Sequence, residues 1–216
     1  EIYYWADQLV HFHFGSDYNK SEITLFLKNN IKEFNVDVKE TSKVIKSLVD
    51  GLNRFGKDFS SSIIRDMASI GYNLESIELG NPVSVEITTT VPSELSCILV
   101  KEKDLPSKTD QFNISAGMLR ALSVIIHINY LEFINNFGAI LIDDIGEGLD
   151  YERSSLLVNL LIDKAKRNNF QLIMTTNDRF VMNSVPLQYW SIINRFGKNI
   201  QFYTEKNSPD VYKNFE

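Results

Sequence analysis

Two adjacent carboxylates and a third acid follow a short apolar run in the middle of the chain. Residues 139–142 (Ala-Ile-Leu-Ile) lead into Asp143 and Asp144, and a turn with two glycines leads on to Asp150. Such an apolar run, bounded by turn residues, is typical of a fully buried strand in a parallel sheet. α/β folds bind ligands at the C-terminal ends of such strands. Because buried carboxylates are costly without a cation, the pattern predicts a cation here, with Mg-nucleotide as the commonest source. The alternative is that the two acids only cap the turn.

Two further segments have polar residues at positions where a ligand can bind. Residues 113–120 (Asn-Ile-Ser-Ala-Gly-Met-Leu-Arg) open a long amphipathic segment in which Ser115 is a suitable helix N-cap. Ala116 and Gly117 allow close approach of the backbone to a ligand, and a helix N-terminus suits phosphate. Residues 172–178 (Leu-Ile-Met-Thr-Thr-Asn-Asp) form another apolar run with a polar end. Taken alone, the first segment is equally compatible with an ordinary capped core helix.

In this order and spacing the three segments resemble the signature motif, the Walker B strand with its D-loop, and the switch loop of ABC-type ATPases. The resemblance is greatest to the group that holds RecF, SMC heads and the overcoming-lysogenization-defect (OLD) ATPases. It covers residues 112 to about 195 well and the first 110 residues loosely. It implies an α/β fold with a mixed and parallel sheet flanked by helices. We expect one domain over 1–216, with a helical insertion at 39–80 and a core at 112–204.

The resemblance also implies roles for individual residues. Asp143 would hold Mg²⁺ through water, and Asp150 would lie in the D-loop that contacts an opposing head. Ser115, Ala116 and Gly117 would bind the ATP held by the partner's phosphate loop. Nucleotide would then join two heads, as a homodimer or a higher oligomer.

Two positions depart from the family where hydrolysis takes place. Asp144 stands where the family usually has a glutamate that positions the attacking water, and a shift of about 1 Å can cost on the order of 100-fold in rate. Asn177 stands where a histidine usually follows two threonines, and an amide cannot carry positive charge. Glu147 in the turn either reaches the water instead or is merely solvated. We therefore expect slow turnover with strong nucleotide-dependent association.

No segment of the sequence matches the phosphate-loop motif in full. Residues 51–58 (Gly-Leu-Asn-Arg-Phe-Gly-Lys-Asp) match G-x-x-x-x-G-K-[ST] except at the last position, and residues 15–21 lack the glycine before the lysine. A true phosphate loop follows a buried strand and supplies a hydroxyl to magnesium. Lys43 and Lys46 instead precede residue 51 at helical spacing, and Asp58 would bring a carboxylate toward the phosphates. We interpret both matches as chance and expect the phosphate loop and N-terminal lobe outside this chain.

The other elements follow from periodicity and turn residues. Residues 1–14 end in the alternation of a strand, 21–30 fit a capped helix, 34–38 a short strand, 82–101 a hairpin, 153–168 an amphipathic helix and 187–204 a closing hairpin. Within the insertion one helical apolar face is formed by Val44, Ile45, Leu48, Val49 and Leu52.

Several titratable side chains have ordinary explanations. His11 and His13 share a strand face but have no further ligand at metal-binding spacing, and His127 is expected to pack rather than catalyse. The basic residues at the end of the 153–168 helix (Lys164, Lys166 and Arg167) are expected to interact with the helix dipole.

Composition narrows the class of protein. The 216 residues are 44% hydrophobic and 23% charged, as in an ordinary globular protein, and the net charge of −6 gives no overall attraction to nucleic acid. The single cysteine, Cys97, favours a reducing cytoplasm. No apolar run approaches a membrane span, no signal peptide is visible, and the start at Glu1 without methionine suggests a fragment.

Three functions are compatible with these residues. The first is an ATP-binding and ATP-hydrolysing head that acts as a switch in bacterial anti-phage defence, together with a nuclease or toxin effector. The second is a RecF-like DNA-repair ATPase, which a basic stripe on the assembled dimer would support. The third is a non-hydrolysing scaffold that does not bind ATP even when its N-terminal lobe is restored.

Overall fold

A computed structural model of the chain describes residues 2–7, 9–13, 24–26, 36–39, 44–84, 94–136 and 138–213. The elements, in order, are α1 (Ile2–Asp7), β1 (Leu9–His13), β2 (Thr24–Phe26), α2 (Val44–Ser69), β3 (Leu74–Gly80), β4 (Glu94–Glu102), β5 (Thr109–Asp110), α3 (Ala116–Ile134), β6 (Ala139–Asp143), α4 (Tyr151–Asn168), β7 (Gln171–Met174), α5 (Arg179–Asn183), a 3₁₀ turn (Leu187–Tyr189), β8 (Ser191–Phe196), β9 (Asn199–Thr204) and α6 (Pro209–Tyr212). The fold is α/β, with parallel and antiparallel sheets flanked by helices, as the sequence predicts.

A parallel sheet in the order β1-β6-β7 positions the predicted acids, because Asp143 is the last residue of β6 and Asp144 begins the turn that follows. Its central strand β6 pairs with β1 from Leu9↔Ala139 to His13↔Asp143 and with β7 from Ala139↔Gln171 to Ile142↔Met174. β6 is mostly buried because both of its edges are paired and its side chains are apolar. This pairing brings the C-terminal ends of β6 and β7 to one edge of the sheet.

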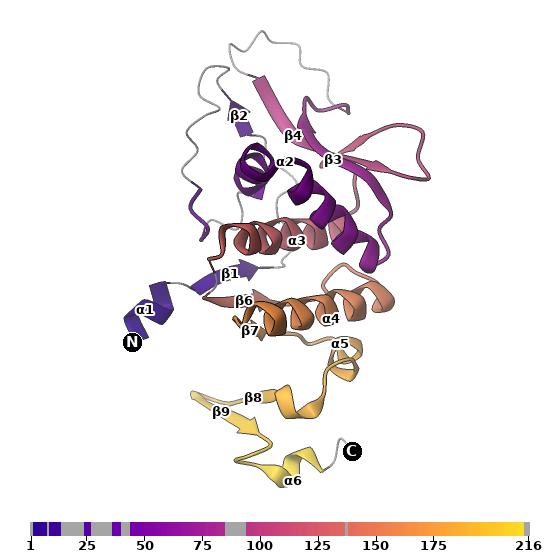
Figure 1. Cartoon of the computed structure of the whole chain (residues 1–216). Helices are drawn as coiled ribbons and strands as arrows, with labels where there is room; N and C mark the ends of the chain where they lie inside the picture. Colours follow the sequence, from indigo (N-terminus) through magenta and orange to yellow (C-terminus); the bar gives the residue numbers. More distant parts are fainter. Residues whose placement is uncertain are drawn as a thin grey trace.

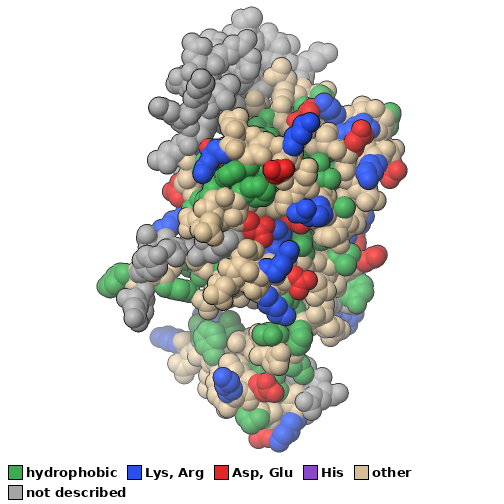
Figure 2. All heavy atoms as spheres, in the orientation of Figure 1, with side chains coloured by type: hydrophobic (Ala, Val, Ile, Leu, Met, Phe, Trp, Pro, Cys, Tyr) green, Lys and Arg blue, Asp and Glu red, His purple; other side chains and the backbone are tan. Residues whose placement is uncertain are grey.

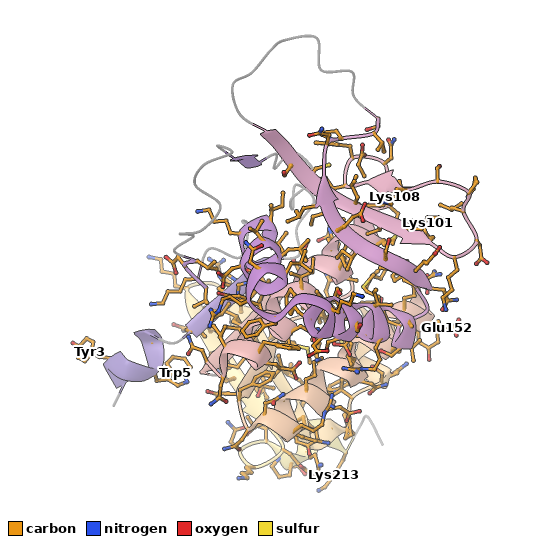
Figure 3. The ribbon with its side chains drawn as sticks, turned by 45° about the horizontal axis from the view of Figure 1, so that its top comes forward. Tyr3, Trp5, Lys101, Lys108, Glu152 and Lys213 are labelled. Atoms are coloured by element: carbon orange, nitrogen blue, oxygen red, sulfur yellow. The ribbon has the colours of Figure 1, made fainter. Side chains whose placement is uncertain are left out.

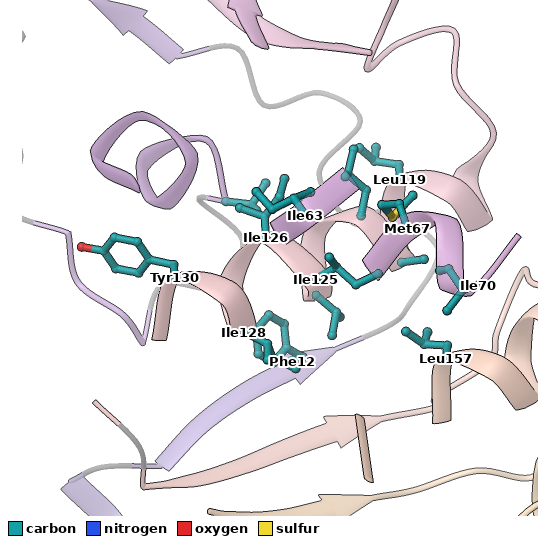
Figure 4. Close-up of a cluster of buried hydrophobic side chains, with 14 of the residues drawn as sticks. Phe12, Ile63, Met67, Ile70, Leu119, Ile125, Ile126, Ile128, Tyr130 and Leu157 are labelled. Carbon is teal, nitrogen blue, oxygen red and sulfur yellow. The ribbon is translucent and has the colours of Figure 1, made fainter. Parts of the chain in front are cut away.

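The helix α3 lies between the parallel sheet and α2 (Figure 1). Every residue of α3 from Gly117 to Leu131 is buried. Figure 4 shows Ile125 and Ile128 of α3 above Phe12 of β1, with Ile63 and Met67 of α2 packed on the other side. α3 is long and apolar enough to cross a membrane, but 83% of that stretch is buried inside the protein, so its length serves the core.

A second, antiparallel sheet lies beyond α2. It has the order β2-β4-β3, with β5 paired to β4, and β3 meets β4 through pairs such as Ile77↔Val100 (Figures 1 and 3). The hairpin β8–β9 is separate from both sheets and extends beyond α5 (Figure 1).

Several of the elements predicted from the sequence differ in the structure. The helix expected at 21–30 is wrong, because residues 24–26 form β2 and pair with β4. Residues 74–80, expected to be helical, form β3, because the chain turns at Gly71 with φ +85° and then pairs with β4. The strand expected at 34–38 is also wrong over its described part, since the Asp37 carboxylate accepts from Lys39 N in a turn.

The first half of the expected 82–101 hairpin also differs. Val83 N and Ser84 N both donate to the buried Asp110 carboxylate at 2.8 Å, which holds residues 82–84 in a bend. Residues 85–93 lie outside the described part of the chain, and the second half of the hairpin is β4. The sequence did not predict the short helices α1, α5 and α6 or the short strand β5.

The near-match to a phosphate loop lies inside a helix. Residues 51–58 belong to α2, which is kinked at Gly56 with φ 56° and ψ −129°. Gly51 is buried, and a Cβ there would lie 2.3 Å from the Phe59 ring. The described structure therefore forms no strand-loop-helix unit at this segment. The second near-match, at 15–21, falls outside the described residues.

A buried ion cluster joins the three large helices and corrects the explanation given for Lys164. The Lys164 side chain is 3% exposed, and its ammonium group lies 2.8 Å from Asp66 of α2 and also pairs with Glu132 of α3. Asn129 donates to the same Asp66 carboxylate at 2.7 Å. Lys164 therefore neutralises buried acids rather than the end of its own helix.

His127 is fully buried in the same core. Its ring meets Phe12 edge-on at 4.9 Å, and its Nδ1 lies 3.4 Å from Ser47 Oγ. Desolvation lowers the pKa of His127 to about 4, because burial disfavours the charged imidazolium.

This pKa predicts a pH dependence of stability. The unfolded chain takes up a proton on His127 below pH about 6.5, whereas the folded chain resists until about pH 4. We expect this group to lower the free energy of unfolding by up to about 3 kcal/mol as pH falls through that window. His127→Phe should flatten the slope in urea titrations followed by circular dichroism, compared with the exposed His11→Phe. Equal slopes in both variants and the parent would contradict the assignment.

Candidate functional site

The ends of β6 and β7 are joined through the side chain of Thr175. Its hydroxyl donates to the Asp143 carboxylate, and its Oγ1 accepts from Asp144 N at 3.0 Å. Two backbone bonds extend the contact, since Thr175 N donates to Ile142 O and Ile145 N donates to Thr175 O, each at 2.9 Å. The structure thus brings together the predicted metal residue and the segment predicted as the switch loop.

The turn after β6 is held in an uncommon backbone conformation. Asp144 has φ +55°, which L-residues adopt rarely and Asp more readily than most. Gly146 and Gly148 have φ +95° and +78°, and a Cβ on Gly146 would lie 3.0 Å from Val181. Such a turn persists only where its surroundings determine it, and here the Thr175 side chain supplies one of the fixed contacts.

A cavity of about 340 Å³ lies on this turn and gathers the three predicted hydrolytic residues. It is lined by Asp144, Ile145, Gly146, Glu147, Gly148, Leu149, Thr176, Asn177 and Asp178. Three of these residues are acids and none is Lys or Arg. Asp143 is not one of the lining residues, and its carboxylate accepts the hydrogen bond from Thr175. The cavity can therefore hold a cation, but it would repel a bare triphosphate.

The predicted signature residues lie at the N-terminus of α3. Ser115 is the N-cap, as predicted, and its Oγ accepts from Met118 N at 3.1 Å. Ala116 is half-buried and begins the helix. Gly117 is buried, and a Cβ on it would lie 2.2 Å from Gly148 O. The close approach that requires glycine here is thus to the turn of the same chain, which is a reason that the sequence does not reveal.

Asp150 caps the next helix. Its side chain accepts from Arg153 N at 2.9 Å and pairs with the Arg153 guanidinium, and these two hydrogen bonds lower its pKa. Arg153 in turn stacks on Tyr72 at 4.6 Å. Asp150 is exposed at the surface.

The segments predicted from the sequence include Thr175 and Arg120, but no role was predicted for either residue. Arg120 is 5% exposed, its Nη1 donates to Glu147 O at 2.9 Å, and its Nη2 lies 3.7 Å from Glu147 Oε1. A signal was present, because an arginine among apolar residues on a helix facing the core needs a buried partner.

The contact between Gly117 and Gly148 generates a prediction about stability. Gly117→Ala should force the turn away from α3 and lower the free energy of unfolding by about 1–3 kcal/mol, as overpacking does. Asn113→Ala, at an exposed position before the same helix, should change it by less than about 0.5 kcal/mol. Urea denaturation of the chain alone measures both variants. A Gly117→Ala protein as stable as its parent would show that Gly117 does not pack against the turn.

Comparison with known proteins supports the fold. No protein-family model and no curated protein matches the chain. Solved structures do match. One, described as the structural biochemistry of ATP-driven dimerization and DNA-stimulated activation of SMC ATPases, has a TM-score of 0.51 and 15% identity over 76% of this chain and 96% of that chain.

Two others are SMC heads with bound partners. The Smc head domain with an extended coiled coil bound to the C-terminal domain of ScpA, from Pyrococcus furiosus, has a TM-score of 0.51 and 15% identity over 82% of this chain. A Smc head bound to the C-winged helix domain of ScpA has a TM-score of 0.51 and 14% identity over 83% of this chain. The chain spans 42% and 54% of the length of these two proteins. Its fold is that of SMC ATPase heads, the ABC-type architecture predicted from the sequence.

Proposed function

We propose that the chain is the lobe of an ATPase head that carries the signature and Walker B motifs, and that the complete head dimerises on Mg-ATP and acts as a switch. The observation that carries this proposal is the contact between Asp143 and Thr175, beside a cavity lined by Asp144, Glu147 and Asn177. A carboxylate at the end of a central parallel strand, with polar groups from the next strand, is where α/β folds bind Mg-nucleotide.

The acids of the site fit magnesium. Mg²⁺ prefers oxygen ligands and keeps several waters, so a single half-buried carboxylate such as Asp143 suffices beside phosphate oxygens. The ion would neutralise charge on the phosphates. In the described part of the chain, no cluster of three or more His, Cys, Asp or Glu side chains forms a self-sufficient metal site.

The acidic lining of the cavity supports a phosphate loop that comes from a segment outside residues 1–216. A triphosphate needs cationic and N–H donors, and the cavity lining offers acids and an amide. Among the described strands β7 is paired on one edge only, so a further strand can add there. The 3₁₀ turn and the hairpin β8–β9 expose apolar side chains that the proposed N-terminal lobe would cover (Tyr189, Ile193, Phe196, Ile200 and Phe202).

Dimerisation would use the N-terminus of α3 and the exposed Asp150. Ser115 is also exposed and lies at a helix N-terminus that favours anions, so it can meet ATP held by a second head. The complete assembly would be a homodimer or higher oligomer joined head to head.

For the biological role we favour a slow sensor in bacterial anti-phage defence, within the OLD-like branch, that holds a nuclease or toxin effector. Asp144 and Asn177 support slow turnover, and the link to defence is analogy. A DNA-repair role has less support, because it would need a basic stripe. On the face drawn in Figure 2, Lys and Arg are interspersed with acids. Lys101 and Lys108, labelled in Figure 3, pair with Glu75 and Glu78.

The first test of this function is magnesium-dependent ATP binding. Joined to a phosphate-loop segment, the chain should bind ATP, and Asp143→Asn should weaken magnesium-dependent binding at least about tenfold. Asp163→Asn, on the exposed side of α4, is the matched control and should bind normally. Residues 1–216 alone should bind negligibly. Tight binding by these residues alone, abolished by Lys57→Ala, would overturn the proposal, and failure to bind even when completed would favour a scaffold.

The second test concerns hydrolysis. A general base must lie within hydrogen-bond reach of the attacking water, and aspartate is one methylene short. Asp144→Glu in the complete head should raise steady-state phosphate release, and Asn177→His should raise it further. Asp163→Glu is the control for the same chemical change away from the cavity. If Asp144→Glu lowers the rate while Glu147→Gln abolishes it, then Glu147 is the base and the slow-sensor argument fails.

A further inference from the structure

Arg120 is a buried cation whose polar contacts within the described part of the chain both reach the turn after β6. Its side chain is 6% exposed, in the buried first half of α3, where its neighbours Met118, Leu119, Ala121 and Leu122 are apolar. A guanidinium in such a position requires partners, because its desolvation is otherwise uncompensated. The partners present are the Glu147 carbonyl at 2.9 Å and the Glu147 carboxylate at 3.7 Å.

Two glycines make this contact possible. A Cβ on Gly148 would lie 2.4 Å from Arg120 Nη1, and a Cβ on Gly117 would lie 2.2 Å from Gly148 O. The first turn of α3 and the turn after β6 are therefore packed backbone against backbone, with the guanidinium beside them. Since close-packed elements do not deform continuously, a shift of the α3 N-terminus must move the turn as well.

The two contacts of Arg120 differ in kind. The carbonyl contact is a charge-assisted hydrogen bond that fixes the turn backbone. The carboxylate lies beyond hydrogen-bond distance, and the Glu147 side chain is 46% exposed and lines the cavity. Arg120 thus fixes the backbone position of Glu147, while the Glu147 carboxylate remains able to rotate.

We propose that Arg120 is a positioning residue that couples a nucleotide at the N-terminus of α3 to the Glu147 turn of the same chain. Nucleotide held by one head would then set the position of acidic groups in the cavity of the other. The proposal rests on the function proposed above, because it needs ATP at the α3 N-terminus. Arg120 acts through the turn and touches no reacting atom.

The test uses the complete head and separates rate from affinity. Arg120→Met should lower kcat and ATP-dependent dimerisation by at least about tenfold, while the KM for ATP stays within about twofold. Arg120→Lys keeps the charge but loses the planar fork, and should restore part of the rate. Arg167→Met, at an exposed position near the end of α4, is the matched control and should behave as the parent. Combined with Glu147→Gln, Arg120→Met should cost less than the sum of the two single effects.

A second measurement needs no nucleotide. In the chain alone, Arg120→Met should speed hydrogen exchange at the amides of Glu147 and Leu149, which are bonded within the turn, and leave those of β8 and β9 unchanged. Unchanged exchange in the turn, unchanged kcat and dimerisation, or additive effects with Glu147→Gln would each overturn the coupling. If the parent head does not bind ATP, the proposed function fails, whereas the exchange measurement still decides whether Arg120 holds the turn.

Discussion

The hydrogen bond from the Thr175 hydroxyl to the Asp143 carboxylate is the contact on which the site depends. It links the ends of two parallel strands whose register is set by apolar pairs such as Ile142↔Met174. The Thr175 Oγ1 also accepts a hydrogen bond from Asp144 N. This bond holds Asp144 at φ +55°, where the chain turns toward the cavity. Without this link, Asp144 would lose the side-chain contact that fixes its uncommon backbone conformation at the start of the turn.

A second constraint comes from α3, the most completely buried helix. One end of α3 packs against the turn through Gly117 and Arg120, and the other end joins the ion cluster of Lys164, Asp66 and Glu132. The helix therefore connects the cavity edge to α2 and α4. The charges are separated in the same way. The cations that contact α3 or lie on it, Lys164 and Arg120, are buried in ion pairs, whereas the cavity is lined by acids and by no Lys or Arg.

The sequence predicted those parts of the fold in which the deciding signal is local. Ser115 capped α3, and the apolar run before Asp143 formed β6, because capping and short apolar runs act over a few residues. β2 was missed because its pairing with β4 joins distant segments and outweighs local helix signals. Lys164, Arg120 and Gly117 could not be interpreted correctly, since each is explained by contacts with another helix or turn.

The most direct measurement is a structure of the completed head with Mg²⁺ and a non-hydrolysable ATP analogue. We expect the ion beside Asp143, the γ-phosphate over the cavity of Asp144, Glu147 and Asn177, and Ser115 of one head facing the nucleotide of the other. Nucleotide bound instead in the roughly 540 Å³ cavity lined by Asp50, Arg54 and Tyr130 would contradict it, as would an ion held away from Asp143.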